Sequence, residues 1–561
     1  MRRFTLFATP FVLSACGGRS GPGSGPPVPA AALAAIDTAA LMNHIRVLSA
    51  DSLMGRAPGS AGEEKTVAYL EAQFKAIGLK PGNTDGTYIQ KVPLVGITVK
   101  GAPAMTFSKG GTTETLKWRD DYVAWTKHVA PGASLKNSDL VFVGYGTEAP
   151  EFNWDDYKGF DAAGKTLVML VNDPPLADTS QFGGPRMTYY GRWTYKFEQG
   201  AKHKAAGVIL VHETGPAGYP FTVVQGNAAE KFDLVTPDKN MSRSDIEAWM
   251  TLDKAKALFA MAGQDFDKLK AEAATRAFKP VPLGATASVT LNNSLRTINS
   301  RNVVAKLEGS DPVLKDEYVI YTAHWDHFGI GTKVDGDSIY NGALDNASGT
   351  AGLLEEAKAF VAMPTPPKRS VLFLAVTAEE QGLLGSAYYA LQPIYPLAKT
   401  AAVINMDGLN QYGKTADITV IGLGASELDD YARLAAAEQG RTLRPDAEPE
   451  KGFYYRSDHF NFAKQGVPAF DPDAGVEFIG KPPEYGKQKR DEYTSKYYHS
   501  PQDEIHADWD MTGAVDDLRL FLTMGYRVAE NAKMPEWRAG NEFKAARDKM
   551  LGKGGPVEPR P

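Results

Sequence analysis

The stretch YVIYTAHWDH, residues 318–327, begins an alternation of apolar and amphipathic segments that decides the predicted fold. Two further apolar segments follow, RSVLFLAVTAEE (369–380) and TAAVINMD (400–407), and helical spacing appears between them in ASGTAGLLEEAKAFVA (347–362) and GLLGSAYYAL (382–391). Solid apolar strands that alternate with helices are typical of a largely parallel sheet with both faces covered. We therefore predict an α/β fold, a mixed sheet with a mostly parallel centre and helices on both faces.

Residues of metal-ligand type stand just past the predicted strands, where α/β sheets bind their ligands. A further acidic residue precedes the helix that begins near 347, and a histidine lies in the loop YYHSPQDE (497–504), whose place in space the sequence does not fix. Two histidines and several carboxylates form a donor set that suits zinc, and less selectively cobalt or manganese. The candidates are His324, Asp326, Asp345, Glu379, Glu380, Asp407 and His499.

Each candidate taken alone also has a structural interpretation. A single histidine at a strand end is often only hydrogen-bonded, an Asp before a helix is often an N-cap, and Glu-Glu pairs are usually solvated. The joint pattern favours a site, because ligand-type residues at successive strand ends rarely coincide. We treat the remaining histidines as structural or exposed, including two that lie near the motifs: His327, His459, His44, His128, His203, His212 and His506.

The motifs together resemble the dizinc aminopeptidases of metallopeptidase clan MH, which also contains glutamate carboxypeptidase and the non-catalytic transferrin receptor. The resemblance is close over residues 300–510 and loose over 40–95. It rests on motifs that occur in the family order: AHWDH (323–327), NGALDNASG (341–349), TAEEQGLLGS (377–386), NMD (405–407), RSDHFNF (456–462) and YHSPQDE (498–504). The implied architecture is the zinc-exopeptidase fold, and the implied cofactor is a pair of Zn²⁺ ions.

The resemblance also implies a role for each candidate residue. Asp345 would bridge both metals, His324 and Asp407 would complete one metal site, and Glu380 and His499 the other. Glu379 would be the general base and Asp326 would orient the His324 ring. Tyr498 would donate a hydrogen bond to the developing oxyanion, and a purely structural packing role is an equal alternative for this residue. The family also implies a cis peptide bond between Asp345 and Asn346.

The implied activity is that of an exopeptidase, most simply an aminopeptidase that hydrolyses N-terminal residues of peptides by a water activated between two metals. A carboxypeptidase, dipeptidase or glutaminyl cyclase on the same fold stays open as an alternative. A non-catalytic binding protein is a remote alternative, because no ligand position is lost. Side-chain specificity, the native metal and the oligomeric state are not encoded in these motifs.

The first sixteen residues, MRRFTLFATPFVLSAC, have the form of a lipoprotein signal peptide that ends at Cys16, the only cysteine. Residues 17–30, GGRSGPGSGPPVPA, would then be a flexible linker. We expect a bacterial envelope lipoprotein, held in the outer membrane by its lipid anchor alone and facing the periplasm or the exterior. Gly17 supports that expectation, because an Asp there tends to retain lipoproteins at the inner membrane.

Length and composition set the domain plan. A chain of 561 residues with 43% hydrophobic residues needs more than one core, and its net charge of −6 argues against nucleic-acid partners. We predict a catalytic domain over 31–124 and 286–545 and a disordered tail over 546–561. The β-rich insert at 125–285 resembles a protease-associated domain in KGFDAAGKTLVML (158–170) and KHKAAGVILVHE (202–213).

Overall fold

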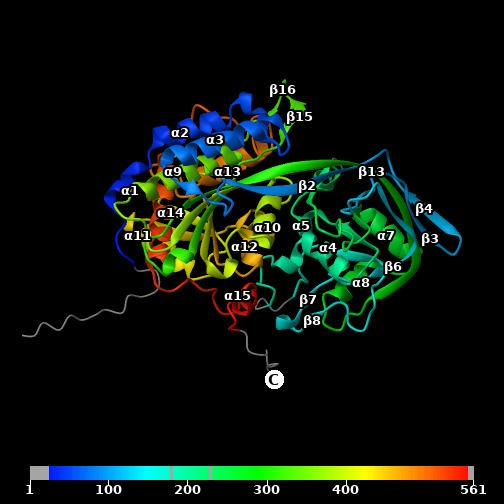
Figure 1. Ribbon diagram of the computed structural model, residues 1–561. Helices are drawn as coiled ribbons and strands as arrows, with labels where there is room; N and C mark the ends of the chain where they lie inside the picture. Colours follow the sequence, from blue (N-terminus) through cyan, green and yellow to red (C-terminus); the bar gives the residue numbers. More distant parts are fainter. Residues whose placement is uncertain (1–24, 177–180, 227–229, 554–561) are drawn as a thin grey trace, which may run out of the picture.

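The computed structural model describes residues 25–176, 181–226 and 230–553, so Cys16 and the predicted signal peptide lie outside the described residues. The chain forms two units that share one long strand, β13 (Val281–Leu307) (Figure 1). The first unit is built on a mixed sheet. Its strand order is β11 (Lys231–Leu234), β2 (Ile89–Val99), β13, β17 (Ser370–Val376), β14 (Tyr318–His324), β18 (Thr400–Asn405), β21 (Ala469–Asp473), β19 (Asp417–Ile421) and β20 (Thr442–Pro445).

The centre of this sheet is parallel, as predicted. Strands β17, β14, β18 and β21 run in parallel, whereas β2 pairs antiparallel with β13, and β13 with β17. Because side chains alternate along a strand, β14 contributes to two cores. Val319 and Tyr321 face one core, and Tyr318 and Ile320 face the other. Burial on both faces explains the unbroken apolar run at 318–323.

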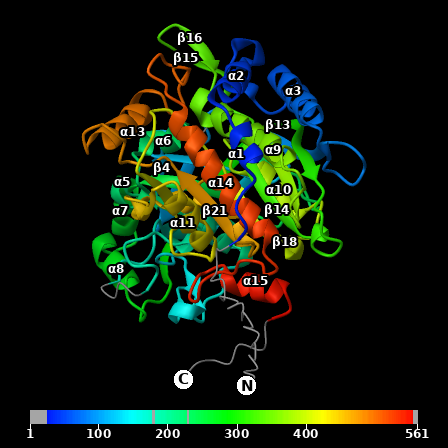
Figure 2. The ribbon, with the colours of Figure 1, turned by 90° about the vertical axis from the view of Figure 1, so that its left-hand side faces the viewer.

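Helices cover both faces of the sheet, which confirms the predicted fold class. Figure 2 looks onto the first layer, where α14 crosses beside α9 and α11. That layer consists of α1 (Ala30–Ala35), α2 (Thr38–Leu48), α3 (Ala61–Ile77), α9 (Gly349–Val361), α11 (Leu428–Glu438) and α14 (Thr512–Glu530). The opposite layer consists of α10 (Leu384–Leu391), α12 (His459–Lys464) and α15 (Lys544–Met550).

The second unit has its own sheet and its own core. Its strand order is β4 (Thr112–Leu116), β3 (Met105–Lys109), the first half of β13, β6 (Gly132–Phe142), β9 (Thr166–Leu170), β10 (Gly207–His212), β12 (Ile246–Thr251) and β5 (Tyr122–Trp125). The helices α4 (Trp193–Lys202), α7 (Leu252–Met261) and α8 (Phe266–Ala273) pack around it.

Strand pairing assigns some segments differently from the predicted domain plan. The strands β3 and β4, and β5 up to Ala124, lie before residue 125, where we placed the start of the insert, yet they pair within the second sheet. β3 pairs with β13 and β5 pairs with β12, and these partners lie more than 120 residues further along the chain, whereas β4 forms a hairpin with β3. Such distant partners leave no local signal in the sequence.

The predicted disordered tail at 546–561 is wrong in its first part. Helix α15 extends to Met550, and Arg547 is buried where it donates to the carbonyl oxygens of Leu397 and Thr400. Part of the predicted linker is also placed, because Val28 packs against the first core before α1 begins at Ala30. Tertiary contacts order these segments, and such contacts cannot be predicted from the Gly-rich and Pro-rich composition.

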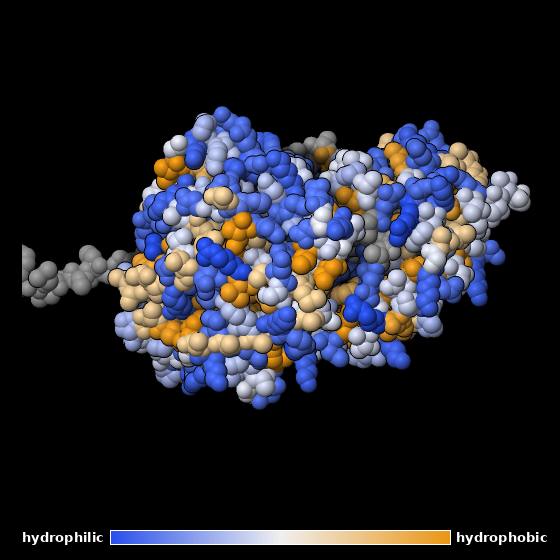
Figure 3. Space-filling model, turned by 90° about the horizontal axis from the view of Figure 1, so that it is seen from above, coloured by the Kyte–Doolittle hydropathy of each residue, from blue (hydrophilic) through white to orange (hydrophobic). Residues whose placement is uncertain are grey.

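Over the described residues, no helix combines the length and the apolar character needed to cross a bilayer. The face seen in Figure 3 is mostly hydrophilic, with hydrophobic residues scattered between polar ones.

Candidate metal centre

The first half of the predicted site forms where two parallel strands end. His324 is the last residue of β14, and Asp407 follows β18 by two residues. His324 Nε2 lies 3.0 Å from Asp407 Oδ1 and 3.3 Å from Asp345 Oδ1. Asp345 reaches this point from the turn at 343–348 that precedes α9. The neighbouring strand ends therefore bring three of the predicted ligands together.

The second half of the site joins a strand end to a distant loop. Glu380 follows β17, whereas His499 lies in the loop after α13 (Tyr485–Lys496). His499 Nε2 lies 3.1 Å from Glu380 Oε2 and 3.2 Å from Asp345 Oδ2. All five predicted ligands thus converge, including the histidine whose place the sequence left open.

Asp345 stands between the two halves and divides its oxygens between them. Oδ1 faces His324, and Oδ2 faces His499. Zinc bonds of about 2.0–2.1 Å in a tetrahedron put neighbouring ligand atoms roughly 3.3–3.4 Å apart. The nitrogen–oxygen distances in both halves, 3.0–3.3 Å, are close to this spacing. The residues present therefore fit a metal ion, and Asp345 belongs to more than one group that could hold one.

The electrostatics of this cluster favour positive charge. Burial alone would lower the pKa of both histidines, but the carboxylates around them prevail. Asp407 and Glu379 raise the pKa of His324 well above its usual range, and Glu380 and Asp345 raise the pKa of His499 to about 10. Burial would likewise raise the pKa of Asp345, but its hydrogen bonds with the two histidines hold it well below the ordinary value. A cluster that holds protons so firmly also suits metal cations.

Glu379 and Asp326 lie beside the five predicted ligands, and Glu379 forms with His324 and Glu380 a group that could itself hold a metal ion. Glu379 Oε2 is 3.9 Å from His324 Nε2, and burial raises the pKa of Glu379 well above its usual value. Asp326 Oδ1 accepts a hydrogen bond from the backbone N–H of Glu379, at 3.1 Å. The His324 ring is held mainly through the backbone, because Nδ1 is 3.2 Å from the carbonyl oxygen of Asp326 and 3.8 Å from its carboxylate.

Two residues that we did not predict position Asp345. Asp503, in the loop motif YHSPQDE, accepts hydrogen bonds from the backbone N–H groups of Leu344 and Asp345, at 3.0 Å each. The Asn346 side chain joins Met406 to the start of α9. The peptide bond between Asp345 and Asn346 is cis, as the family resemblance implied. Asp503 lies in the motif YHSPQDE and Asn346 in NGALDNASG. Membership of these motifs was the signal in the sequence that could have identified them.

Tyr498 lies at the mouth of the site. Its ring stacks on His499 with centroids 3.7 Å apart, and the side chain is 50% exposed. Burial raises the pKa of the Tyr498 hydroxyl well above its usual range. The negative charges of nearby carboxylates raise it further, in the order Asp345, Glu380, Glu379 and Asp407. The hydroxyl is therefore near the carboxylates and keeps its proton.

The histidines that we set aside are not all remote from the site. His327 is fully buried, and its Nδ1 lies 2.5 Å from Glu380 Oε1. His459 is also buried, but its Nδ1 faces Asp471 at 3.4 Å and not the predicted ligands. His327 therefore contacts one of the predicted ligands, and its position three residues after His324 was the signal that the sequence offered.

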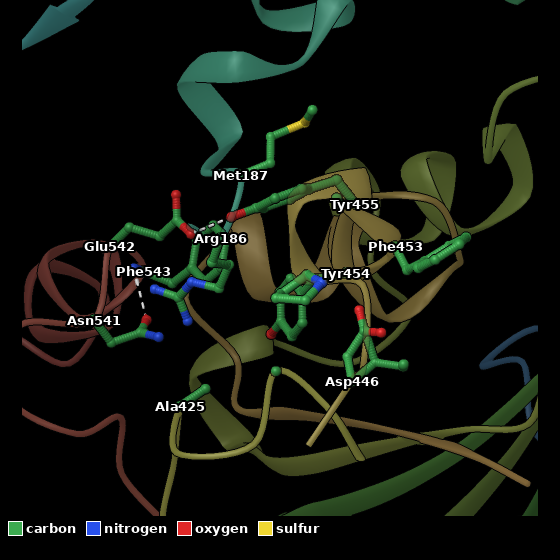
Figure 4. Close-up of a pocket in the computed structure, with 14 residues that line it drawn as sticks. Arg186, Met187, Ala425, Asp446, Phe453, Tyr454, Tyr455, Asn541, Glu542 and Phe543 are labelled. Atoms are coloured by element: carbon green, nitrogen blue, oxygen red, sulfur yellow. Dashed lines mark hydrogen bonds between the residues drawn. The ribbon is translucent and has the colours of Figure 1, made fainter. Parts of the chain in front are cut away.

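A separate pocket lies behind the segment that carries Tyr454 and Tyr455 (Figure 4). Arg186 and Met187 of the second unit line it, and Tyr455 donates to Glu542 there at 2.6 Å. None of the five predicted ligands is among its lining residues. This pocket is distinct from the metal centre.

Comparison with known proteins finds a family similarity in the part of the chain that holds the site. Residues 302–523 match the model of peptidase family M28. This part of the chain is therefore similar to that family. This segment contains all five predicted ligands, Glu379, Asp326 and Tyr498.

Individual relatives match parts of the M28 domain. Aminopeptidase NAALADL1 of Mus musculus is 34% identical over 131 residues, which is 22% of this chain and 16% of that protein. Leucine aminopeptidase 2 of Trichophyton equinum is 27% identical over 248 residues, 41% of this chain and 45% of that protein. The chain thus spans about a sixth of the first curated relatives that it matches.

A solved structure extends the comparison to most of the chain. The aminopeptidase from Aneurinibacillus sp. strain AM-1 covers 89% of this chain and 95% of its own, with a TM-score of 0.50 and 20% identity. At this identity the likeness concerns the fold. It agrees with the α/β architecture of the first unit.

Proposed function

We propose that the chain is a metallo-aminopeptidase that holds two zinc ions and hydrolyses the N-terminal residue of peptides. The division of the Asp345 oxygens between His324 and His499 carries the proposal, because a shared carboxylate is what a pair of metals requires. The M28 match and the aminopeptidase relatives support the reaction class. Cobalt or manganese would suit the same donors.

The residues divide the work of hydrolysis. Bound metals would lower the pKa of the attacking water and polarise the scissile carbonyl group. Glu379, beside the ligands, takes the proton of that water at its carboxylate and returns it to the leaving amine. Asp326 fixes the backbone of Glu379, and Ser457 Oγ donates to Asp407 Oδ2 at 2.6 Å. Tyr498 donates to the developing oxyanion.

A carboxypeptidase or dipeptidase is the second candidate, and one observation favours it. Arg456 directly precedes Ser457, and in the described part of the chain its guanidinium pairs with no carboxylate. Arg456 donates to the carbonyl oxygen of Lys451 and packs over Phe453, while its Nε has no hydrogen-bond partner there. A substrate carboxylate would meet this cation. The excess of acidic side chains around the metals favours a free α-ammonium group and hence the aminopeptidase.

A substrate panel separates the two candidates. We expect the protein to hydrolyse leucine p-nitroanilide and leucyl-alanine amide, to lose this activity with a zinc chelator, and to regain it when zinc is added back. The N-acetylated forms of both substrates should resist, because the free amine is required. Release of p-nitroaniline and of free leucine would be measured.

The blocked substrates are the control that decides between the candidates. Cleavage of N-acetyl-leucyl-alanine, together with inertness toward leucine p-nitroanilide, would replace the aminopeptidase with a carboxypeptidase. Elemental analysis of the same preparations should find two zinc ions per chain. One ion after zinc reconstitution would contradict the two-metal proposal.

We also propose that the chain is an envelope lipoprotein that a lipid on Cys16 anchors in the outer membrane. Support comes from the sequence of residues 1–16. Cells that express the wild type should retain the protein with membranes, whereas Cys16→Ser should appear in the soluble fraction. Equal membrane retention of both, or a mass spectrum with an unmodified N-terminus at another residue, would refute the anchor.

The second unit stands as a proposed protease-associated domain. It has a sheet and a core of its own and returns the chain to the M28 domain through β13. The sequence motifs at 158–170 and 202–213 support this assignment. In the structure these segments form β9 and β10, which pair in parallel.

A further inference from the structure

His327 is a buried histidine whose partner lies in the metal centre. Its side chain is fully buried, in the loop that follows β14. Its Nδ1 lies 2.5 Å from Glu380 Oε1. Among the described residues neither of these two atoms, nor His327 Nε2, has another hydrogen-bond partner. A buried imidazole without other partners is costly, so its contact with Glu380 needs an explanation.

The two oxygens of Glu380 have different neighbours. Oε2 lies 3.1 Å from His499 Nε2, on the side of the shared carboxylate of Asp345. Oε1 points to the opposite neighbour, His327. One oxygen is therefore free to bind a metal next to His499, while the other is held by the imidazole. This division fixes the rotation of the carboxylate about its last bond.

The backbone around His327 leaves the ring little freedom. Gly342 has φ +54, and a Cβ atom at that position would lie 2.6 Å from His327 Cγ. The ring of Phe328 packs edge-on at 5.0 Å between centroids. Glycine at 342 thus makes room for the imidazole in the turn that also presents Asp345. The position of the ring is built into the site.

We propose that His327 is a positioning residue, which donates its Nδ1–H to Glu380 Oε1 and holds Oε2 toward the metal next to His499. The inference rests on the proposed two-metal function and deepens it. Partners in the second shell typically change metal affinity or activity by about 10–100-fold when they are removed. The expected effect is selective, because His324 and Asp407 do not depend on Glu380 for their contacts.

The test uses the full chain and measures zinc binding as well as activity. His327→Ala should weaken binding of one zinc ion by roughly 10–100-fold and leave the other zinc ion nearly unchanged, in a titration against a chromophoric chelator. His327→Asn keeps an N–H donor near the position of Nδ1 and should recover much of this loss. In kinetics at limiting zinc, kcat should fall while KM for leucine p-nitroanilide stays near the wild-type value.

A matched control removes another buried histidine. His212 lies in the second unit, where its Nε2 contacts the carbonyl oxygen of Tyr219. His212→Ala should keep both zinc affinities. Circular dichroism and thermal unfolding would verify that each variant is folded, and His327→Asn carries the test if His327→Ala does not fold.

Three results would overturn the inference. Wild-type affinity for both zinc ions in His327→Ala would show that Glu380 needs no support. Equal loss of both ions would show a structural role. An X-ray absorption spectrum that shows two imidazole ligands on the zinc next to His499 would indicate that His327 is itself a ligand. If the wild type bound no zinc at all, the proposed function would fail before His327 was tested.

Discussion

Glu379→Ala should lower kcat by roughly two to four orders of magnitude while both zinc ions stay bound. The variant removes the carboxylate that takes the proton of the attacking water. It leaves the five ligands intact, because Glu379 lies beside the cluster, 3.9 Å from His324 Nε2. Steady-state kinetics with leucine p-nitroanilide and elemental analysis of the same sample would measure both effects.

Its neighbour supplies the matched control. Glu380 is adjacent in sequence, and its carboxylate faces His499 at 3.1 Å. Glu380→Ala should therefore lose a zinc ion, and excess zinc should restore part of its activity. If Glu379→Ala released zinc and Glu380→Ala retained both ions, the two roles would have to be exchanged.

The sequence was sufficient where local pattern and topology coincide. Solid apolar runs predicted β14, β17 and β18, and the rule that ligands lie at the carboxyl ends of parallel strands predicted the positions of His324, Glu380 and Asp407. The place of His499 came only from the family order of motifs, because a loop after α13 has no periodic signal. The structure places that loop against Asp345.

The supports of the site could not be read from the sequence. Arg56 is buried, and its guanidinium donates to the carbonyl oxygens of Leu48, Trp325, Asn341 and Gly342 at distances of 2.5–2.9 Å. These carbonyls belong to α2 and to the two loops that carry the ligands. From the sequence alone, an arginine in GRAPGSAG (55–62) is expected at the surface. Only its long-range contacts show that it joins the loops together.

His327 shows the same limit within the site. In AHWDH (323–327) the second histidine has the right chemistry, but the sequence does not tell which way its ring points. Only the close approach of Gly342 and the rotation of Glu380 determine that direction. The donors that hold ligands in place depend on tertiary geometry more than the ligands do.

Asp345→Ala should remove both zinc ions and reduce peptide hydrolysis to background. Asp345 gives one oxygen to each half of the site, so its loss affects His324 and His499 together. The variant would also lose a carboxylate that contacts both histidines. Elemental analysis after dialysis, titration with zinc, and activity with leucine p-nitroanilide would measure these effects.

The control for Asp345→Ala is a buried carboxylate outside the cleft. Asp429 in α11 accepts a hydrogen bond from the backbone N–H of Gly424 at 2.7 Å. Asp429→Asn should keep both zinc ions and full activity, even if its thermal stability falls. Asp345→Asn retains one carbonyl oxygen and should keep at most one weakly bound zinc ion. Two firmly bound ions in Asp345→Ala would mean that the metals do not share this carboxylate, and the site would then consist of two independent centres.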